Sequence, residues 1–233
     1  MKIIRTTILL VIAMMYTGTA SAQDVKIFLK DGSKLLVPYD QLDSIVSISY
    51  TEKDFVDLGL SVRWAAYNVG AEKPEDTGSF FAWGETQPKK SYRKENSIMY
   101  DKDMTNICSD VRYDAAACAW GVTMRMPTEA EFTELMNLCV WTPETLEGVG
   151  GYRVTGPNGN SIFLPAAGYI NIDSYDHPRE GYYWSGDPLG KENEYAVGIH
   201  FGNEVPFIIH AFRYFGFLVR PVTRHDLKTE IIM

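Results

Sequence analysis

Oxygen-bearing side chains gather in two stretches of the C-terminal half of the chain. They are Asn171, Asp173 and Asp176 in the first stretch, and Asp187, Glu192, Asn193 and Glu194 in the second. Calcium takes about six to eight oxygen ligands at close range, which makes Asp173, Asp176, Asp187 and Glu192 weak candidates for calcium ligands. A charged loop is more often solvated than metal-bound. We therefore expect the protein to hold no cofactor, with calcium as the alternative.

Ligand recognition is a second chemistry that the residue types allow. Two predicted loops carry aromatic, amide and charged side chains: Tyr169, Asn171, Asp173, Tyr175, His177 and Arg179 in one, and Asn203, Glu204, His210 and Arg213 in the other. Tyrosine and arginine give a large contact area at a modest entropic cost. We predict that these residues bind a ligand. For the loop aromatics the alternative of a packing role stays open, and for Trp184 we favour packing in the core.

Catalysis has less support. The chain has four histidines, which are His177, His200, His210 and His225. They fall in separate predicted strands and loops, whereas a metal site needs several ligands together in space. The chain also has three cysteines, Cys108, Cys118 and Cys139, and no histidine lies near them in sequence to activate a nucleophile. We predict a protein that is not an enzyme.

A helix pair between Asp114 and Cys139 must position much of the domain. Thr128 followed by Glu131 has the pattern of a reciprocal capping box, with Pro127 before it, and predicts a helix that starts at Thr128. The apolar residues then recur at the spacing of one helical face, which predicts burial against a sheet; they are Phe132, Leu135, Met136 and Cys139.

Cysteines and arginines near this helix pair are interpreted as structural. Cys118 and Cys139 fall on the inferred buried faces of the two helices, so we expect buried thiols or one disulfide. A buried arginine must be paired. We expect Arg125 and Arg220 to be such residues, with Asp114 or Glu131 as partners.

The rest of the chain indicates β-structure. Residues 23–50 form a small β unit in which Asp31-Gly32 predicts a hairpin. Residues 51–54 are a polar linker, 55–222 the main domain and 223–233 a charged tail that we expect to fray. Strands are predicted over 56–65 (a pair), 80–84, 151–155, 161–164, 182–185, 195–201 and 216–220, and Asn158-Gly159 predicts the turn of the 151–164 hairpin. The segment 170–181 is predicted to be a loop.

The first 22 residues have the pattern of a secretory signal peptide. Lys2 and Arg5 precede the apolar run 8–15, and Ala20-Ser21-Ala22 forms a small-residue cleavage site without a cysteine after it. We therefore expect export to the periplasm, the medium or the cell surface, without a lipid anchor and without a transmembrane segment in the mature chain. Removing this segment takes away two of the 22 basic residues and none of the 30 acidic ones, which leaves a net charge of −10. Such a charge argues against nucleic acid as a partner.

Several motifs together resemble one known family. They are Val62-Arg63-Trp64-Ala65, Phe81-Ala82-Trp83-Gly84-Glu85, Arg125-Met126-Pro127-Thr128, Leu164-Pro165-Ala166-Ala167-Gly168, Tyr183-Trp184-Ser185 and Val219-Arg220-Pro221-Val222. In this order, over residues 55–222, they look like the Fibrobacter succinogenes major paralogous domain family, found in exported proteins of the Bacteroidetes and Fibrobacteres. The resemblance implies an α+β, C-type-lectin-like fold, similar to that of formylglycine-generating enzymes, with two helices packed on antiparallel sheets.

The resemblance implies a fold more than an activity. The cysteine pair that formylglycine-generating enzymes use near the end of the domain is missing, and so are the Glu-Pro-Asn and Trp-Asn-Asp motifs of calcium-dependent lectins. We expect a binding or adhesion module that recognises a glycan or a surface protein through its loops. The alternatives are a structural subunit of a pilus or other surface assembly, joined through residues 25–49, and a metal-dependent enzyme of the same superfamily.

Overall fold

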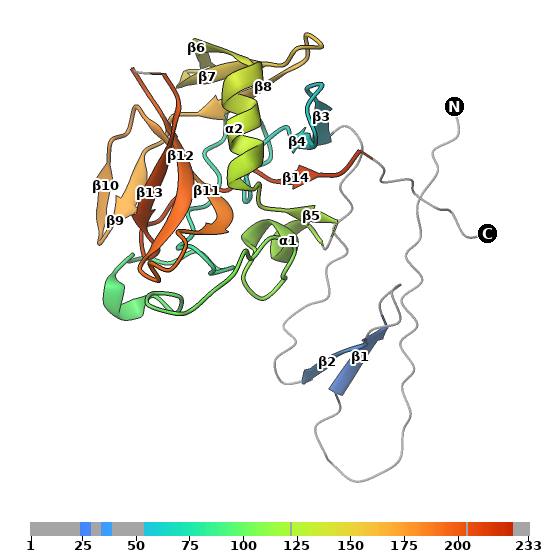
Figure 1. The fold of residues 1–233 in the computed structure, drawn as a ribbon, viewed down its shortest axis with the longest axis vertical. Helices are drawn as coiled ribbons and strands as arrows, with labels where there is room; N and C mark the ends of the chain where they lie inside the picture. Colours follow the sequence, from blue (N-terminus) through green and yellow to red (C-terminus); the bar gives the residue numbers. More distant parts are fainter. Residues whose placement is uncertain (1–23, 29–33, 39–53, 122, 204, 226–233) are drawn as a thin grey trace, which may run out of the picture. The chain divides into compact units, whose positions relative to one another are not determined.

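The computed structural model describes residues 24–28, 34–38, 54–121, 123–203 and 205–225, which belong to an N-terminal unit and a main domain (Figure 1). In the N-terminal unit, β1 (Asp24–Phe28) and β2 (Lys34–Pro38) pair antiparallel. The predicted hairpin is therefore confirmed. The part of the predicted β unit that follows residue 38, the signal peptide and residues 226–233 lie outside the described residues.

The main domain is mostly antiparallel sheet with two short helices. A four-stranded sheet has the order β3 (Phe55–Asp57), β4 (Arg63–Ala65), β14 (Val222–Thr223) and β5 (Met124–Arg125). A second sheet contains β6 (Val140–Leu146), β7 (Val149–Thr155) and β8 (Ser161–Pro165), and a third contains β11 (Gly181–Pro188), β12 (Tyr195–Phe201) and β13 (Phe207–Phe212). A small hairpin joins β9 (Tyr169–Asn171) to β10 (Ser174–Asp176), and a 3-10 turn spans Lys94–Asn96.

Both helices are capped at their N-termini by side chains. The carboxylate of Asp114 accepts hydrogen bonds from the amides of Ala116 and Ala117 at the start of α1 (Ala115–Trp120). In front of α2 (Glu129–Leu138), Thr128 and Glu131 form the predicted capping box. Two helices in the predicted places are thus confirmed, and the capping pattern is what made the second one readable from the sequence.

Thr128→Ala should destabilise the domain by about 1 kcal/mol, because the Glu131 amide at the start of α2 loses its hydrogen-bond acceptor. Urea unfolding measures this difference. Asn137→Ala, an exposed change in the same helix, is the control and should move the unfolding midpoint little. Equal effects of the two substitutions would contradict a capping role.

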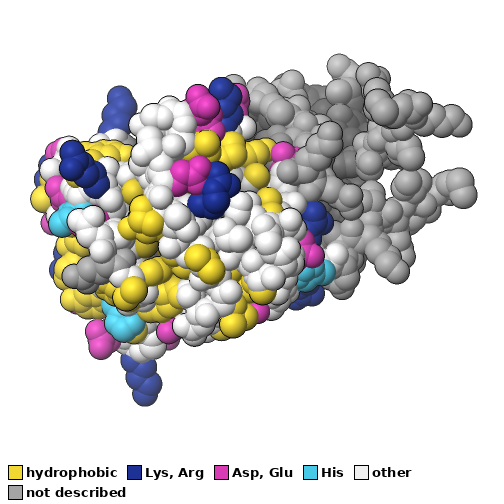
Figure 2. All heavy atoms as spheres, turned by 90° about the horizontal axis from the view of Figure 1, so that it is seen from above, with side chains coloured by type: hydrophobic (Ala, Val, Ile, Leu, Met, Phe, Trp, Pro, Cys, Tyr) yellow, Lys and Arg dark blue, Asp and Glu magenta, His cyan; other side chains and the backbone are white. Residues whose placement is uncertain are grey.

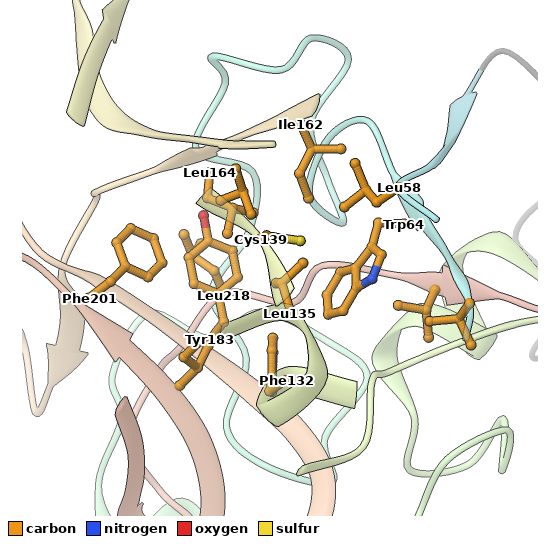
Figure 3. Close-up of a cluster of buried hydrophobic side chains, with 14 of the residues drawn as sticks. Leu58, Trp64, Phe132, Leu135, Cys139, Ile162, Leu164, Tyr183, Phe201 and Leu218 are labelled. Atoms are coloured by element: carbon orange, nitrogen blue, oxygen red, sulfur yellow. The ribbon is translucent and has the colours of Figure 1, made fainter. Parts of the chain in front are cut away.

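The helix α2 holds the main core together. Its buried face carries Phe132 and Leu135 toward Trp64 of β4, Leu164 of β8 and Tyr183 of β11, as Figure 3 shows. All of these side chains are at most 1% exposed. The predicted apolar stripe is therefore buried against more than one sheet, which makes α2 the element that the sheets share.

Of the two alternatives expected for the cysteines, buried thiols or one disulfide, the disulfide does not form, because all three are free thiols. Cys139 is buried as expected, whereas Cys118 is exposed. The buried face of α1 is formed by its alanines and Trp120, and Cys118 lies on the other side. Burial raises the pKa of the Cys108 thiol to about 12 and that of Cys139 to about 11, so neither is a thiolate at neutral pH.

Several strand predictions need correction. The strand pair at 55–65 and the 149–165 hairpin are confirmed. In contrast, 80–84 and 216–220 are buried extended segments linked by a single bridge between Phe81 and Phe217. Strands β6, β9, β10 and β13 form where loops or no strands were predicted. The domain also continues past residue 222, since Thr223 is buried and donates to the Thr123 carbonyl.

Within the described residues, no helix is long and apolar enough to cross a membrane.

Candidate functional site

A cleft of about 300 Å³ with an aromatic lining lies on the surface of the main domain. Its lining consists of Tyr169, Tyr182, Tyr195, Ile209, His210, Ala211, Phe212, Phe215 and Phe217. These residues come from β9, all three strands of the β11-β12-β13 sheet and the segment after β13. The cleft therefore exists only because segments far apart in the sequence meet at one face of this sheet.

The strand register explains how one lining ring packs against the sheet. Residues that pair across antiparallel strands present their side chains on the same face. Trp184 pairs with Gly198, which pairs in turn with Ile209. Because Gly198 has no side chain, the ring of Phe217 lies close to the sheet here, and a Cβ on Gly198 would stand 3.6 Å from that ring.

The aromatic walls are built as a contiguous set of rings. Tyr169 lies at its centre, with its ring centroid 4.8 Å from Tyr182, 5.3 Å from Phe215 and 5.6 Å from Phe217. The ring of His177 stacks on Tyr169 at 5.8 Å with an interplanar angle of 14°. This arrangement fixes the tyrosine in place and gives the cleft an aromatic wall whose rings are tilted against one another by 39° to 72°.

A carboxylate next to the cleft orients its polar groups. Glu180 accepts a hydrogen bond from the Tyr182 hydroxyl at 2.6 Å and lies 2.9 Å from Nε2 of His200 and 3.2 Å from Nδ1 of His177. Burial pushes the pKa of Glu180 up, but the hydrogen bonds from Tyr182 and His200 outweigh it and hold the pKa below the usual value. Burial and the same contact raise the pKa of Tyr182. At neutral pH the site thus carries a carboxylate and a protonated phenol.

Part of the predicted binding set meets at this cleft. Tyr169 and His210 line it, and His177 stacks on its wall. Asn171 and Tyr175 lie on the β9–β10 hairpin and are not among the lining residues, and Arg179 is exposed in the turn before β11. Asn203 is exposed in the β12–β13 connection, and Glu204 lies outside the described residues.

Arg213 does not belong to a ligand-binding surface, because it is fully buried. Its guanidinium lies 4.5 Å from the centre of the Trp83 ring and donates to the carbonyls of Tyr195, Met99 and Lys102. The sequence prediction was wrong for this residue. Two of its hydrogen bonds instead hold residues 99–102 at the end of β13, and the third reaches Tyr195 on β12.

The predicted oxygen ligands are engaged elsewhere. Asp173 pairs with Arg93, and the two carboxylate oxygens of Asp187 accept from Asn106 and from the Glu129 amide at the start of α2. Asp176 accepts from Ser174, and Glu192 is exposed. Among the described residues, no group of three or more His, Cys, Asp or Glu side chains is placed to hold a metal ion.

Structural interpretations of the arginines agree with their contacts. Arg125 forms a two-pronged ion pair with Glu131 at 2.7 and 2.5 Å. Although burial raises it, the pKa of Glu131 stays below its usual value because of Arg125 and the Thr128 amide. Arg220 is fully buried as expected, but it bonds to Asn68 and to two carbonyls and not to Asp114 or Glu131. Trp184 is fully buried and stacks on Phe217 at 4.1 Å.

Sequence reasoning missed most of the cleft. It did not single out Glu180 or Phe215 as site residues, and it placed Tyr182 and Phe217 in predicted strands. A usable signal was present in the close spacing of Phe212, Tyr214, Phe215 and Phe217, which is dense for a segment predicted to be partly loop. No family model, curated protein or solved structure matches the chain.

Proposed function

We propose that this chain is an exported, non-enzymatic binding module with a C-type-lectin-like fold, of the Fibrobacter succinogenes major paralogous domain type. The ordered motifs between residues 62 and 222 support the family. The mainly antiparallel sheets with two helices between β4 and β6 support the fold class. The basic and apolar N-terminal segment supports export.

The ligand of the module is a glycan, and the aromatic cleft is its binding site. The carrying observation is the aromatic wall made by Tyr169 and its ring neighbours beside hydroxyl and imidazole groups. Sugar rings have apolar C–H faces, which pack on aromatic rings. They also carry hydroxyl groups, which need directed hydrogen bonds. A tyrosine supplies both, because its ring is apolar and its tip is polar. Concave sites with a mostly apolar lining and few polar groups are typical of small-ligand binding.

Tyr169→Ala should weaken glycan binding about 10- to 30-fold, because a central aromatic contact in a binding site is worth about 2 kcal/mol. A glycan array identifies the ligand, and isothermal titration then compares the purified variants. Tyr175→Ala is the matched control, since Tyr175 is half exposed on the neighbouring β10 and does not line the cleft.

Two results would contradict this proposal. One is an array without any bound glycan for the folded protein. The other is an equal loss of affinity in Tyr169→Ala and Tyr175→Ala, which would place the ligand outside the cleft. Circular dichroism of both variants shows whether the fold is retained.

A further inference from the structure

Glu180 fixes the hydrogen-bond direction of three side chains beside the cleft. Its carboxylate oxygen Oε2 lies 2.6 Å from the Tyr182 hydroxyl, 2.9 Å from Nε2 of His200 and 3.2 Å from Nδ1 of His177. An ionised carboxylate only accepts hydrogen bonds, so each of these three atoms must carry the proton. The carboxylate therefore decides which atoms of its neighbours keep free lone pairs.

The remaining polar atoms of these neighbours are acceptors. A tyrosine hydroxyl has one proton, and Tyr182 uses it on Glu180, which leaves only lone pairs on the phenol oxygen. Imidazole is mostly neutral at neutral pH and then carries one N–H, so Nε2 of His177 and Nδ1 of His200 carry no proton. The His177 side chain is exposed, whereas Nδ1 of His200 is buried and has no partner among the described residues. These side chains thus offer a ligand acceptors and no donor.

The carboxylate itself keeps one oxygen for a ligand. All of its contacts within the described chain use Oε2, which leaves Oε1 without a hydrogen-bond partner there. The side chain of Glu180 is 29% exposed. Glu180 does not line the cleft, but it lies one hydrogen bond away from Tyr182, which does. A ligand that packs on the aromatic wall therefore needs to extend only one polar group to reach this oxygen.

The charge at this part of the cleft is negative. Burial raises the pKa of Tyr169 most, and the two charged groups that raise it further are Asp176 and Glu180. Of the described residues that line the cleft, none is a lysine or an arginine. Figure 2 shows a related surface on one face of the domain, where histidine and acidic side chains lie at the edge of hydrophobic surface. Acceptors with a negative charge suit a ligand group that donates hydrogen bonds and is positive.

We infer that the cleft selects glycans that carry a free amino group, and that Glu180 is the residue that selects them. This inference rests on the proposed glycan site and names the class of sugar that the site takes. A protonated amine is positive and only donates hydrogen bonds, so it complements Glu180 Oε1, the Tyr182 oxygen and the aromatic rings. N-acetylation removes the charge and leaves a single donor. An acidic sugar carries a carboxylate, which only accepts and is repelled.

Isothermal titration with matched oligosaccharides tests the inference. The probes are a tetrasaccharide of glucosamine, its N-acetylated counterpart and a tetrasaccharide of galacturonic acid. We expect the wild type to bind the amino form at least about tenfold more tightly than the N-acetylated form, because hydrogen bonds between charged groups are stronger than neutral ones. The acidic form should bind most weakly. Raising the salt concentration from about 50 mM to about 500 mM should reduce the preference, because ions screen the attraction.

Glu180→Gln is the decisive variant. It keeps the shape of the side chain and an oxygen for the Tyr182 hydroxyl but removes the charge. The preference for the amino form should fall below about threefold, while the N-acetylated form binds as before. Glu147→Gln is the matched control, because it removes the same charge from an exposed turn between β6 and β7 in another sheet. The two variants have equal net charge, so a general attraction between an acidic protein and a cationic sugar predicts the same result for both.

The outcomes separate this inference from the proposed function. If the folded protein binds no oligosaccharide, either in titration or on the glycan array, the glycan site itself is wrong. An array on which only sugars without a free amine are bound, or a titration without a preference for the amino form, would overturn the inference and leave the glycan site standing. Equal preferences in Glu180→Gln and Glu147→Gln would overturn it as well. So would an equal loss of both sugars in Glu180→Gln, because Glu180 would then support the shape of the cleft and not select the ligand.

Discussion

Arg220→Met is expected to lower the free energy of unfolding by about 3 kcal/mol or more, because three buried acceptors lose their donor and each unsatisfied buried group costs about 1–3 kcal/mol. The Arg220 guanidinium is fully buried and donates to Asn68 Oδ1 at 2.8 Å, to the Ala65 carbonyl at 3.0 Å and to the Phe163 carbonyl at 2.9 Å. Methionine fills a similar volume but leaves three buried acceptors without donors. A domain of this size has little stability in reserve, so we expect much of the variant to be unfolded at 37 °C.

The geometry of Arg220 separates a hydrogen-bonding role from a charge effect. Burial lowers the pKa of Arg220 to about 10, so the group is still charged at neutral pH. Lysine keeps the charge but lacks the planar fork that reaches three acceptors at once. Arg220→Lys should therefore recover only part of the loss. Arg224→Met, an exposed change four residues later, is the control. A loss below about 1 kcal/mol in urea unfolding of Arg220→Met would contradict the structural role, because it is less than one unsatisfied buried group costs.

Asp114→Ala is the second substitution with a large expected effect, a destabilisation of about 3 kcal/mol or more. Asp114 is fully buried, and its two carboxylate oxygens accept four backbone hydrogen bonds. One oxygen caps α1, and the other binds the amides of Ser109 and Met126 at 2.8 and 2.9 Å. Alanine would leave four amides without an acceptor, and each unsatisfied buried donor costs about 1–3 kcal/mol, reduced where water enters. Thermal unfolding measures the effect.

Asparagine at the same position makes the prediction sharper. Asp114→Asn keeps one oxygen for the α1 amides but turns an NH₂ group toward the Ser109 and Met126 amides, so donors would face donors. We expect most of the alanine effect to remain. Asp103→Ala, an exposed carboxylate nearby in sequence, should change stability by no more than about 0.5 kcal/mol. If Asp114→Asn were as stable as the wild type, the segments around Ser109 and Met126 would not depend on this carboxylate.

Elements that depend on local sequence signals could be predicted from the sequence. The capping box needs only Thr128 and Glu131, which are three residues apart, and the structure forms it. The turn at Asn158-Gly159 depends on the left-handed conformation that glycine adopts, and Gly159 has a φ of +86°. The hairpin of β7 and β8 follows from it. Such signals act within a few residues and do not depend on the rest of the domain.

Features that depend on contacts between residues far apart in the sequence could not be predicted. Both Arg213 and Arg220 lie near aromatic residues late in the chain, and one was taken for a ligand contact and the other for a structural group. Both are buried. What buries Arg213 is the Trp83 ring, together with carbonyls more than 100 residues away. The strand β13 was missed because a continuous apolar run does not show the alternation that identifies a half-buried strand.

The sequence by itself determined the helix pair, the hairpins at 24–38 and 149–165, the strand pair at 55–65 and strands β11 and β12, because caps, turns and periodicity are short-range properties of the chain. The tertiary structure alone decided which residues share a surface. It brought Tyr169, Tyr182 and Phe215 to one cleft and set Glu180 between two histidines. It also separated Asp173 from Asp187 and occupied each with a different partner. A binding site is a property of such long-range packing, which no window of the sequence contains.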